Sequence, residues 1–142
     1  MSHSEVLSGE IDTLRRLRRH RADRAERALR EAKKAQKTLA AHIQQAQDAL
    51  EHTRQEEARQ TAQLLSEHQG QVLDRKALKA WSAKEQNLSV NTRREEHQLQ
   101  ALQGQCAQQA MAVGSAQRQV TLCLRQVEKI QELSNLLTQE PI

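Results

Sequence analysis

Side chains that could bind a metal or react are few in this chain of 142 residues, and they are widely spaced. The six histidines never stand four residues apart, and the HExxH pattern of helical zinc sites is absent. Only two cysteines are present, Cys106 and Cys123, too few for a structural zinc site. The four glycines never cluster, and no GK[ST] phosphate-binding loop occurs. We therefore expect no catalytic, cofactor-binding or metal-binding residue, no small-molecule substrate and no enzyme activity.

The composition is typical of long helices. Aromatic residues make up 1% of the chain, and Trp81 is the only one. Hydrophobic residues reach 37%, against roughly 45–50% in an average soluble domain. Ala, Leu, Arg, Lys and Glu together supply just over half of the residues, which indicates a coiled coil when a heptad period accompanies it. The single proline is Pro141, so no proline interrupts a helix before it.

Apolar residues recur in alternating steps of four and three residues in both halves of the chain, and we call these positions the seam. The seam positions are Ala25, Leu29, Ala32, Gln36, Leu39, Ile43, Ala46 and Leu50 in the first half, and Leu88, Thr92, Glu95, Leu99, Leu102, Cys106, Gln109, Val113, Ala116, Val120, Cys123, Val127, Ile130, Ser134 and Leu137 in the second. A repeat of 3.5 residues over several heptads predicts supercoiled helices. Both cysteines fall on the seam, so we expect small buried thiols and no redox role.

Between the two halves the seam becomes polar, at Thr53, Glu57 and Gln60, but its phase continues. Phase alone permits one very long helix that dimerises. A hairpin is favoured because Gly70 reads as a C-terminal cap and Asp74 as an N-cap, and Ser82–Glu85 has the spacing of a capping box. The outermost apolar seam residues, Ile11 and Leu137, also have their midpoint at position 74.

The predicted fold is all-α, a long antiparallel two-helix coiled-coil hairpin. We expect an N-terminal tail at 1–10, a first helix with a basic stem at 11–65 and a hairpin tip at 66–82. A second helix at 83–138 and a C-terminal tail at 139–142 complete the expected organisation.

Charge is concentrated near the start of the first helix. Residues 15–37 hold eleven basic and three acidic side chains, a net charge of +8, in a chain whose formal charge is +4. A solvated helix face is the simplest interpretation. Phosphate contact to nucleic acid is a second, although no asparagine that could read a base occurs before Asn87. A third is a protein partner with an acidic surface, since arginine pairs bidentately with carboxylates.

Two further candidates lie near the tip, Leu78 and Trp81. A lone tryptophan can close the end of a hairpin whose seam is otherwise polar. It can also anchor a partner, since binding energy concentrates in a few Trp, Tyr and Arg side chains.

The segment Ile11-Asp12-Thr13-Leu14-Arg15-Arg16-Leu17-Arg18-Arg19-His20-Arg21-Ala22-Asp23-Arg24-Ala25 resembles the start of the type III secretion stalk proteins of the YscO/HrpO type, which are similar to flagellar FliJ. The shared pattern is a leucine, a basic pair, a further basic cluster and an Ala-rich amphipathic helix. The resemblance implies an antiparallel coiled coil that binds a hexameric export ATPase with its terminal end and an export-gate membrane protein with its other end. Family members also bind export chaperones.

On this resemblance we expect a non-enzymatic stalk or adaptor of a type III secretion (injectisome) apparatus that couples the ATPase to the gate. It would be cytoplasmic, at the periphery of the inner membrane. The ATPase contacts would be Arg15, Arg16, Arg18 and Arg19, and the gate contacts Leu78 and Trp81. The alternatives are a basic-stem coiled coil that binds nucleic acid, which the sequence disfavours, and a plain dimeric scaffold.

Overall fold

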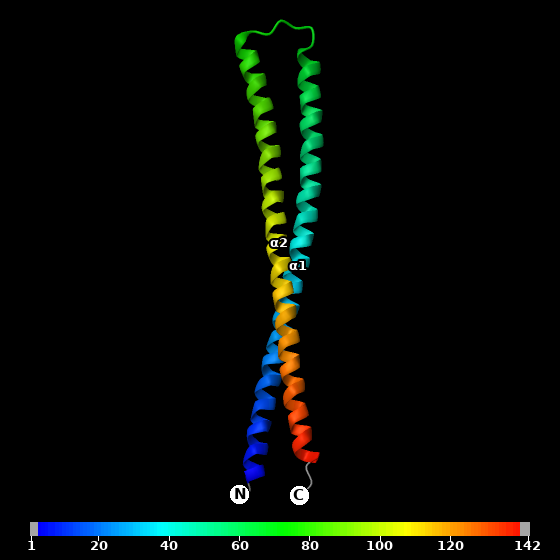
Figure 1. Ribbon diagram of the computed structural model, residues 1–142. Helices are drawn as coiled ribbons and strands as arrows, with labels where there is room; N and C mark the ends of the chain where they lie inside the picture. The colour runs from blue at the N-terminus through cyan, green and yellow to red at the C-terminus, as the bar shows by residue number, and fades with distance from the viewer. Residues whose placement is uncertain (1–2, 140–142) are drawn as a thin grey trace. The chain divides into compact units, whose positions relative to one another are not determined.

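The computed structural model describes residues 3–139, which form two helices, α1 (His3–His68) and α2 (Arg75–Gln139). No strand occurs among these residues. The two helices pack against each other and run in opposite directions (Figure 1). The predicted all-α antiparallel hairpin is confirmed. The alternative of one continuous helix is wrong, because residues 69–74 are not helical.

The turn between the helices is built from two of the predicted capping residues. Gly70 has φ 76°, a left-handed conformation that glycine adopts without steric cost. Asp74 caps α2, because its Oδ1 accepts a hydrogen bond of 2.7 Å from the backbone N–H of Ala77. Ser82, by contrast, lies inside α2 and starts no helix. The non-helical turn is shorter than the expected tip of 66–82, and both helices extend beyond the expected 11–65 and 83–138.

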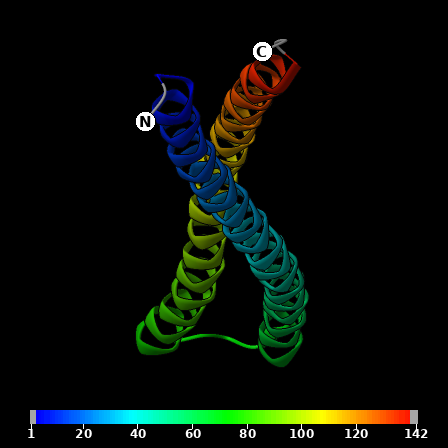
Figure 2. The same ribbon diagram turned by 90° about the horizontal axis from the view of Figure 1, so that it is seen from below.

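Two compact units divide the chain. The terminal unit comprises Met1–Lys37 and Gln108–Ile142, and the turn unit comprises Thr38–Ala107. In the terminal unit the start of α1 lies beside the end of α2, as both views show (Figures 1 and 2). In the turn unit the second part of α1 and the first part of α2 are joined by the turn.

The terminal unit holds the apolar core. Ala22, Ala25, Val120 and Cys123 form a buried cluster against which Leu29 and Val127 pack. Ala22 is only 1% exposed, so the two backbones approach closely at this point. Ile11 and Ile130 are also buried in this unit. Six of the eight buried hydrophobic residues in the described chain therefore belong to the terminal unit.

Part of the seam in the turn unit is polar. Thr92 is 8% exposed, and its hydroxyl donates a hydrogen bond of 2.5 Å to Glu57 Oε2 on the other helix. Glu95 is half-buried, and its Oε2 is buried without a hydrogen-bond partner. Leu50 and Leu64 are the buried apolar residues of this unit. Hydrogen bonds therefore replace part of the apolar packing in this unit.

Burial follows the seam closely. Every seam position from Ala25 to Leu50 and from Leu88 to Leu137 is buried or half-buried. Continued back from Leu88, the predicted phase reaches Glu85, Trp81 and Leu78. Trp81 is half-buried as this phase predicts, but Leu78 and Glu85 are exposed, and Ala77 is half-buried in place of Leu78. The reason is that the inward side of the first turns of α2 is taken by Ala77 and Trp81, which are four residues apart and share a face.

Candidate partner-binding surfaces

The four candidate arginines of the basic stem divide into two pairs. Stepping back from Ala25 in fours and threes reaches Ala22, Arg18, Arg15 and Ile11, so Arg15 and Arg18 occupy seam positions. Both are half-buried, whereas Arg16 and Arg19 are exposed. The structure therefore separates two half-buried arginines on the seam from two exposed arginines beside it.

Arg18 ties the two helices together. Its Nη1 donates a hydrogen bond of 2.9 Å to the backbone oxygen of Gln126 on α2. That oxygen belongs to a helical residue and gains a second donor in this way. Arg15 makes an exposed ion pair of 3.5 Å with Asp12, one turn earlier on α1. Of these two arginines, Arg18 is therefore the one that links α1 to α2.

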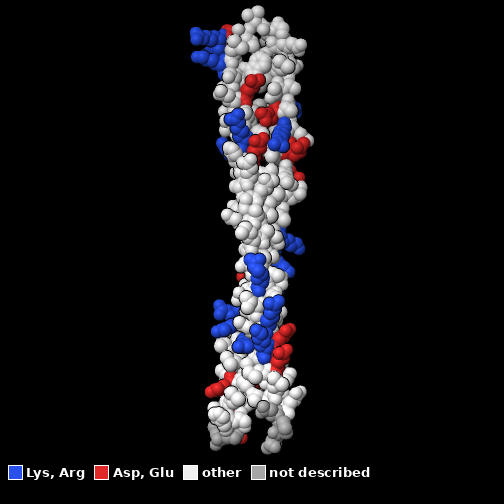
Figure 3. All heavy atoms as spheres, in the orientation of Figure 1, with Lys and Arg blue, Asp and Glu red and all other residues white. Residues whose placement is uncertain are grey.

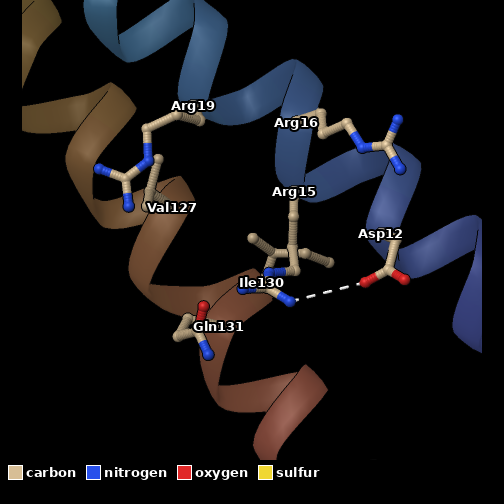
Figure 4. A pocket seen from close by; sticks show the side chains of 7 residues that line it. All are labelled: Asp12, Arg15, Arg16, Arg19, Val127, Ile130 and Gln131. Carbon is tan, nitrogen blue, oxygen red and sulfur yellow. Dashed lines mark ion pairs between the residues drawn. The ribbon is translucent and has the colours of Figure 1, made fainter.

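A cleft of about 380 Å³ opens beside these residues in the terminal unit. Its lining residues are Asp12, Arg15, Arg16, Arg19, Val127, Ile130 and Gln131 (Figure 4). The Arg15 side chain lies over Ile130, Arg19 extends toward Val127, and Arg16 points away from α2 (Figure 4). The cleft thus combines an apolar floor from α2 with guanidinium groups from α1. Such a site suits a carboxylate carried on a partner's loop or helix.

The side of the hairpin on which this cleft lies follows from the seam. Asp12, Arg16 and Arg19 each come directly after a seam position of α1, and Gln131 comes directly after Ile130 of α2. The ion pair of 3.2 Å between Arg54 and Glu96 in the turn unit obeys the same rule, since these residues follow Thr53 and Glu95. We call this side of the terminal unit the following face.

Basic side chains gather in the terminal unit on the face drawn in Figure 3, whereas basic and acidic side chains alternate in the turn unit. In the turn unit the acids are paired locally. Arg59 donates two hydrogen bonds to Glu56, one turn earlier on the same helix. Those bonds, with a third from Gln60, lower the pKa of Glu56 from 4.5 to about 2, and the same pairing raises the pKa of Arg59. The cationic surface of the terminal unit is less neutralised.

At the turn, Trp81 packs within the hairpin. Its ring stacks on His68, the last residue of α1, with a centroid distance of 5.0 Å and an interplanar angle of 27°. Its indole N–H donates a hydrogen bond of 2.8 Å to Glu85. Trp81 is half-buried, and this geometry favours closing the end of the hairpin over anchoring a partner. The stacking on His68 was not anticipated from the sequence.

Leu78, the other tip candidate, is 53% exposed. Val72 in the turn is fully exposed, and Leu65 near the end of α1 is 59% exposed. Three large apolar side chains near the turn are thus exposed, and Leu78 is one of them.

The two cysteines lie on the seam as free thiols. Cys123 is buried and Cys106 half-buried, and Cys123 Sγ accepts a weak contact of 3.7 Å from Gln119. Among residues 3–139, no group of three or more His, Cys, Asp or Glu side chains could hold a metal ion. In the same range, neither helix is apolar over a stretch long enough to cross a bilayer.

Fold and surfaces together define a class: an all-helical hairpin that exposes cationic and apolar side chains along its described residues. Within that class, the chain matches the profile of the family described as type III secretion protein YscO over residues 11–141, nearly its whole length. The chain belongs to the YscO family of type III secretion proteins. No curated protein and no solved structure matches it.

Proposed function

We propose that this YscO-family protein is a non-enzymatic stalk and adaptor that binds the hexameric export ATPase through the terminal unit and the export-gate membrane protein through the turn. The family places the chain in type III secretion. The observation that carries the ATPase contact is the following-face cleft, whose lining includes the exposed Arg16 and Arg19 of α1 together with Val127 and Ile130 of α2. Such a protein would work at the periphery of the inner membrane.

The structure supports a narrower assignment than the four arginines of the sequence pattern. Arg18 is engaged with the backbone of Gln126, and Arg15 with Asp12. Arg16 and Arg19 make no ion pair within residues 3–139. We propose that they contact acidic side chains of the ATPase. Opposite charges would speed the encounter of the two proteins and fix how they align.

The contact with the export gate rests on exposed apolar surface near the turn. Leu78 and Val72 are available there, whereas the Trp81 ring is held by His68. We therefore assign Leu78 a direct contact and Trp81 the role of holding the start of α2 in place. Export chaperones remain an expected partner on the family resemblance, with no contact assigned.

The test is ATP hydrolysis by the purified export ATPase of the same secretion system, measured with and without this protein. We expect hydrolysis to rise with the wild-type chain and the rise to be lost with Arg16→Glu/Arg19→Glu. Arg93→Glu/Arg94→Glu is the matched control, because it makes the same charge change in the turn unit. No stimulation by the wild-type chain, or equal loss with both double variants, would overturn the proposal.

A further inference from the structure

Opposite the arginine cleft, the terminal unit exposes a row of leucines. Leu7 is 42% exposed, Leu14 42% and Leu17 44% on α1, and on α2 Leu133 is 46% and Leu136 62% exposed. Each of them comes directly before a position of the seam: Leu14 before Arg15, and Leu133 before Ser134. Five large apolar side chains at one kind of position form a patterned surface, unlike scattered exposed leucines.

Within each unit, residues that directly precede the seam share one side of the helix pair. A cleft in the turn unit demonstrates this rule, because its walls include Glu56 from α1 and Asn91, Arg94 and Gln98 from α2, each directly before a seam position. The following face lies on the other side, as the arginine cleft shows. By the same helical geometry the five leucines of α1 and α2 line one common side of the terminal unit, which we call the preceding face.

The preceding face changes from apolar to basic along the helices. Beyond Leu17 the next positions of this kind on α1 are Arg21 and Arg24, and on α2 the position next to Leu133 is Lys129. All three basic residues are exposed. Glu10 is the acid among the leucines. The face therefore offers an apolar half near the chain ends and a mainly cationic half farther along, where Leu122, directly before Cys123 and 52% exposed, is the large apolar side chain.

We propose that the preceding face of the terminal unit binds an amphipathic α-helix of another protein, one with leucine-like side chains along one side and acidic side chains toward one end. A third helix fits the groove between two antiparallel helices by ridge-into-groove packing. Its apolar side covers Leu14, Leu17 and Leu133, and its acidic end lies against Arg21 and Arg24. This surface is separate from the arginine cleft assigned to the ATPase.

Charge opposes a second copy of this chain packed in parallel as the occupant. A copy packed face to face in parallel brings its own Arg21, Arg24 and Lys129 against the same three cations and supplies no acidic cluster. Like charges placed opposite one another oppose such a pairing. An acidic partner helix satisfies both halves of the face.

The test uses the full chain and two synthetic helical peptides of about 18 residues, or five turns. Both peptides carry leucines at i, i+3, i+4 and i+7, and one ends in glutamates where the other ends in lysines. We expect the glutamate peptide to bind about tenfold or more tightly than the lysine peptide, because its acids meet Arg21 and Arg24. Binding is read by fluorescence polarisation at fixed salt, and helicity of each variant by circular dichroism.

Two variants remove the two halves of the face separately. Leu14→Gln/Leu17→Gln should lower the affinity for the glutamate peptide about tenfold. Met111→Gln, at an exposed apolar site away from this face, should leave that affinity unchanged. Arg21→Glu/Arg24→Glu should reverse the preference between the peptides, and Arg27→Glu/Arg30→Glu is its charge-matched control. The arginine variants touch no packed side chain, so they test the proposal even if the leucine variant is unstable.

Several outcomes would overturn this inference. One is no binding of the glutamate peptide, and another is equal binding of both peptides. A third is a wild-type dimer that Leu14→Gln/Leu17→Gln disperses, which would show a second copy on the face. A fourth is loss of ATPase stimulation with the leucine variant while peptide binding persists, which would assign the face to the ATPase. Absence of ATPase stimulation by the wild-type chain would bear on the proposed function alone.

Discussion

The terminal unit and the turn unit use the same heptad spacing but fill it with different chemistry. In the terminal unit Ala22, Ala25, Val120 and Cys123 close the seam with small apolar side chains. In the turn unit a hydrogen bond between Thr92 and Glu57 occupies the same kind of position. A polar pair in a seam lowers stability relative to apolar packing but fixes the register of the two helices. The comparison shows that the apolar core of this protein lies in the terminal unit, the same unit that carries the cationic surface.

The largest expected effect is on the apolar seam. Ala22→Glu places a charge at a site that is 1% exposed, and we expect the free energy of unfolding to fall by about 3 kcal/mol. Ala28→Glu makes the same substitution at an exposed position of the same helix and should change it by about 0.5 kcal/mol or less. Urea denaturation followed by circular dichroism measures both. Equal effects of the two variants would refute the distinction between seam and surface.

A second prediction concerns the polar seam. Replacing both partners in Glu57→Leu/Thr92→Val removes a buried polar pair and leaves no orphaned group of that pair, so we expect stability to rise by about 1–2 kcal/mol. Thr92→Val alone should not give this gain, because it leaves the Glu57 carboxylate without its donor. Urea midpoints of the three proteins provide the measurement. A marked loss of stability in the double variant would mean that the polar pair is the better filling of the seam.

A smaller effect is expected at the hydrogen bond between Arg18 and Gln126. Arg18→Ala removes a donor that links α1 to α2 and should cost about 1 kcal/mol. Arg19→Ala, at the neighbouring exposed position, should change stability by about 0.5 kcal/mol or less. The same denaturation experiment separates them. If Arg19→Ala proved the more damaging, the division of the arginines into two pairs would be wrong.

The smallest effect is local to α1 of the turn unit. The pKa of Glu56 lies at about 2, below its usual 4.5, because Arg59 and then Gln60 hydrogen-bond to the ionised carboxylate. A lowered pKa means that this interaction is present in full above pH 4.5 and is lost as the pH falls through about 2. Carboxyl-carbon NMR should place the Glu56 midpoint well below 4.5 and show it rising in Arg59→Gln. A midpoint near 4.5 in the wild type would contradict the pairing.

Much of the fold follows from the sequence because a repeat of 3.5 residues leaves few ways to bury its apolar positions. The cap at Asp74 and the left-handed Gly70 could also be predicted, because each depends on residues that are close to it in the sequence. Charge alone predicts Arg15 and Arg18 as partner contacts, although stepping the seam back from Ala25 places both of them on it. The stacking of Trp81 on His68 depends on contact between two helix ends across the turn, which local spacing does not encode.

The measurement that tests the central claim most directly is hydrogen exchange of the chain, alone and with the export ATPase. Alone, amides around Ala22, Ala25 and Val120 should exchange more slowly than those around Glu57 and Thr92, because apolar packing resists local opening. With the ATPase, protection should rise at residues 12–19 and 127–131, around the arginine cleft, and stay constant in the turn unit. Equal exchange in the two units of the free chain, or protection by the ATPase confined to the turn unit, would contradict the account.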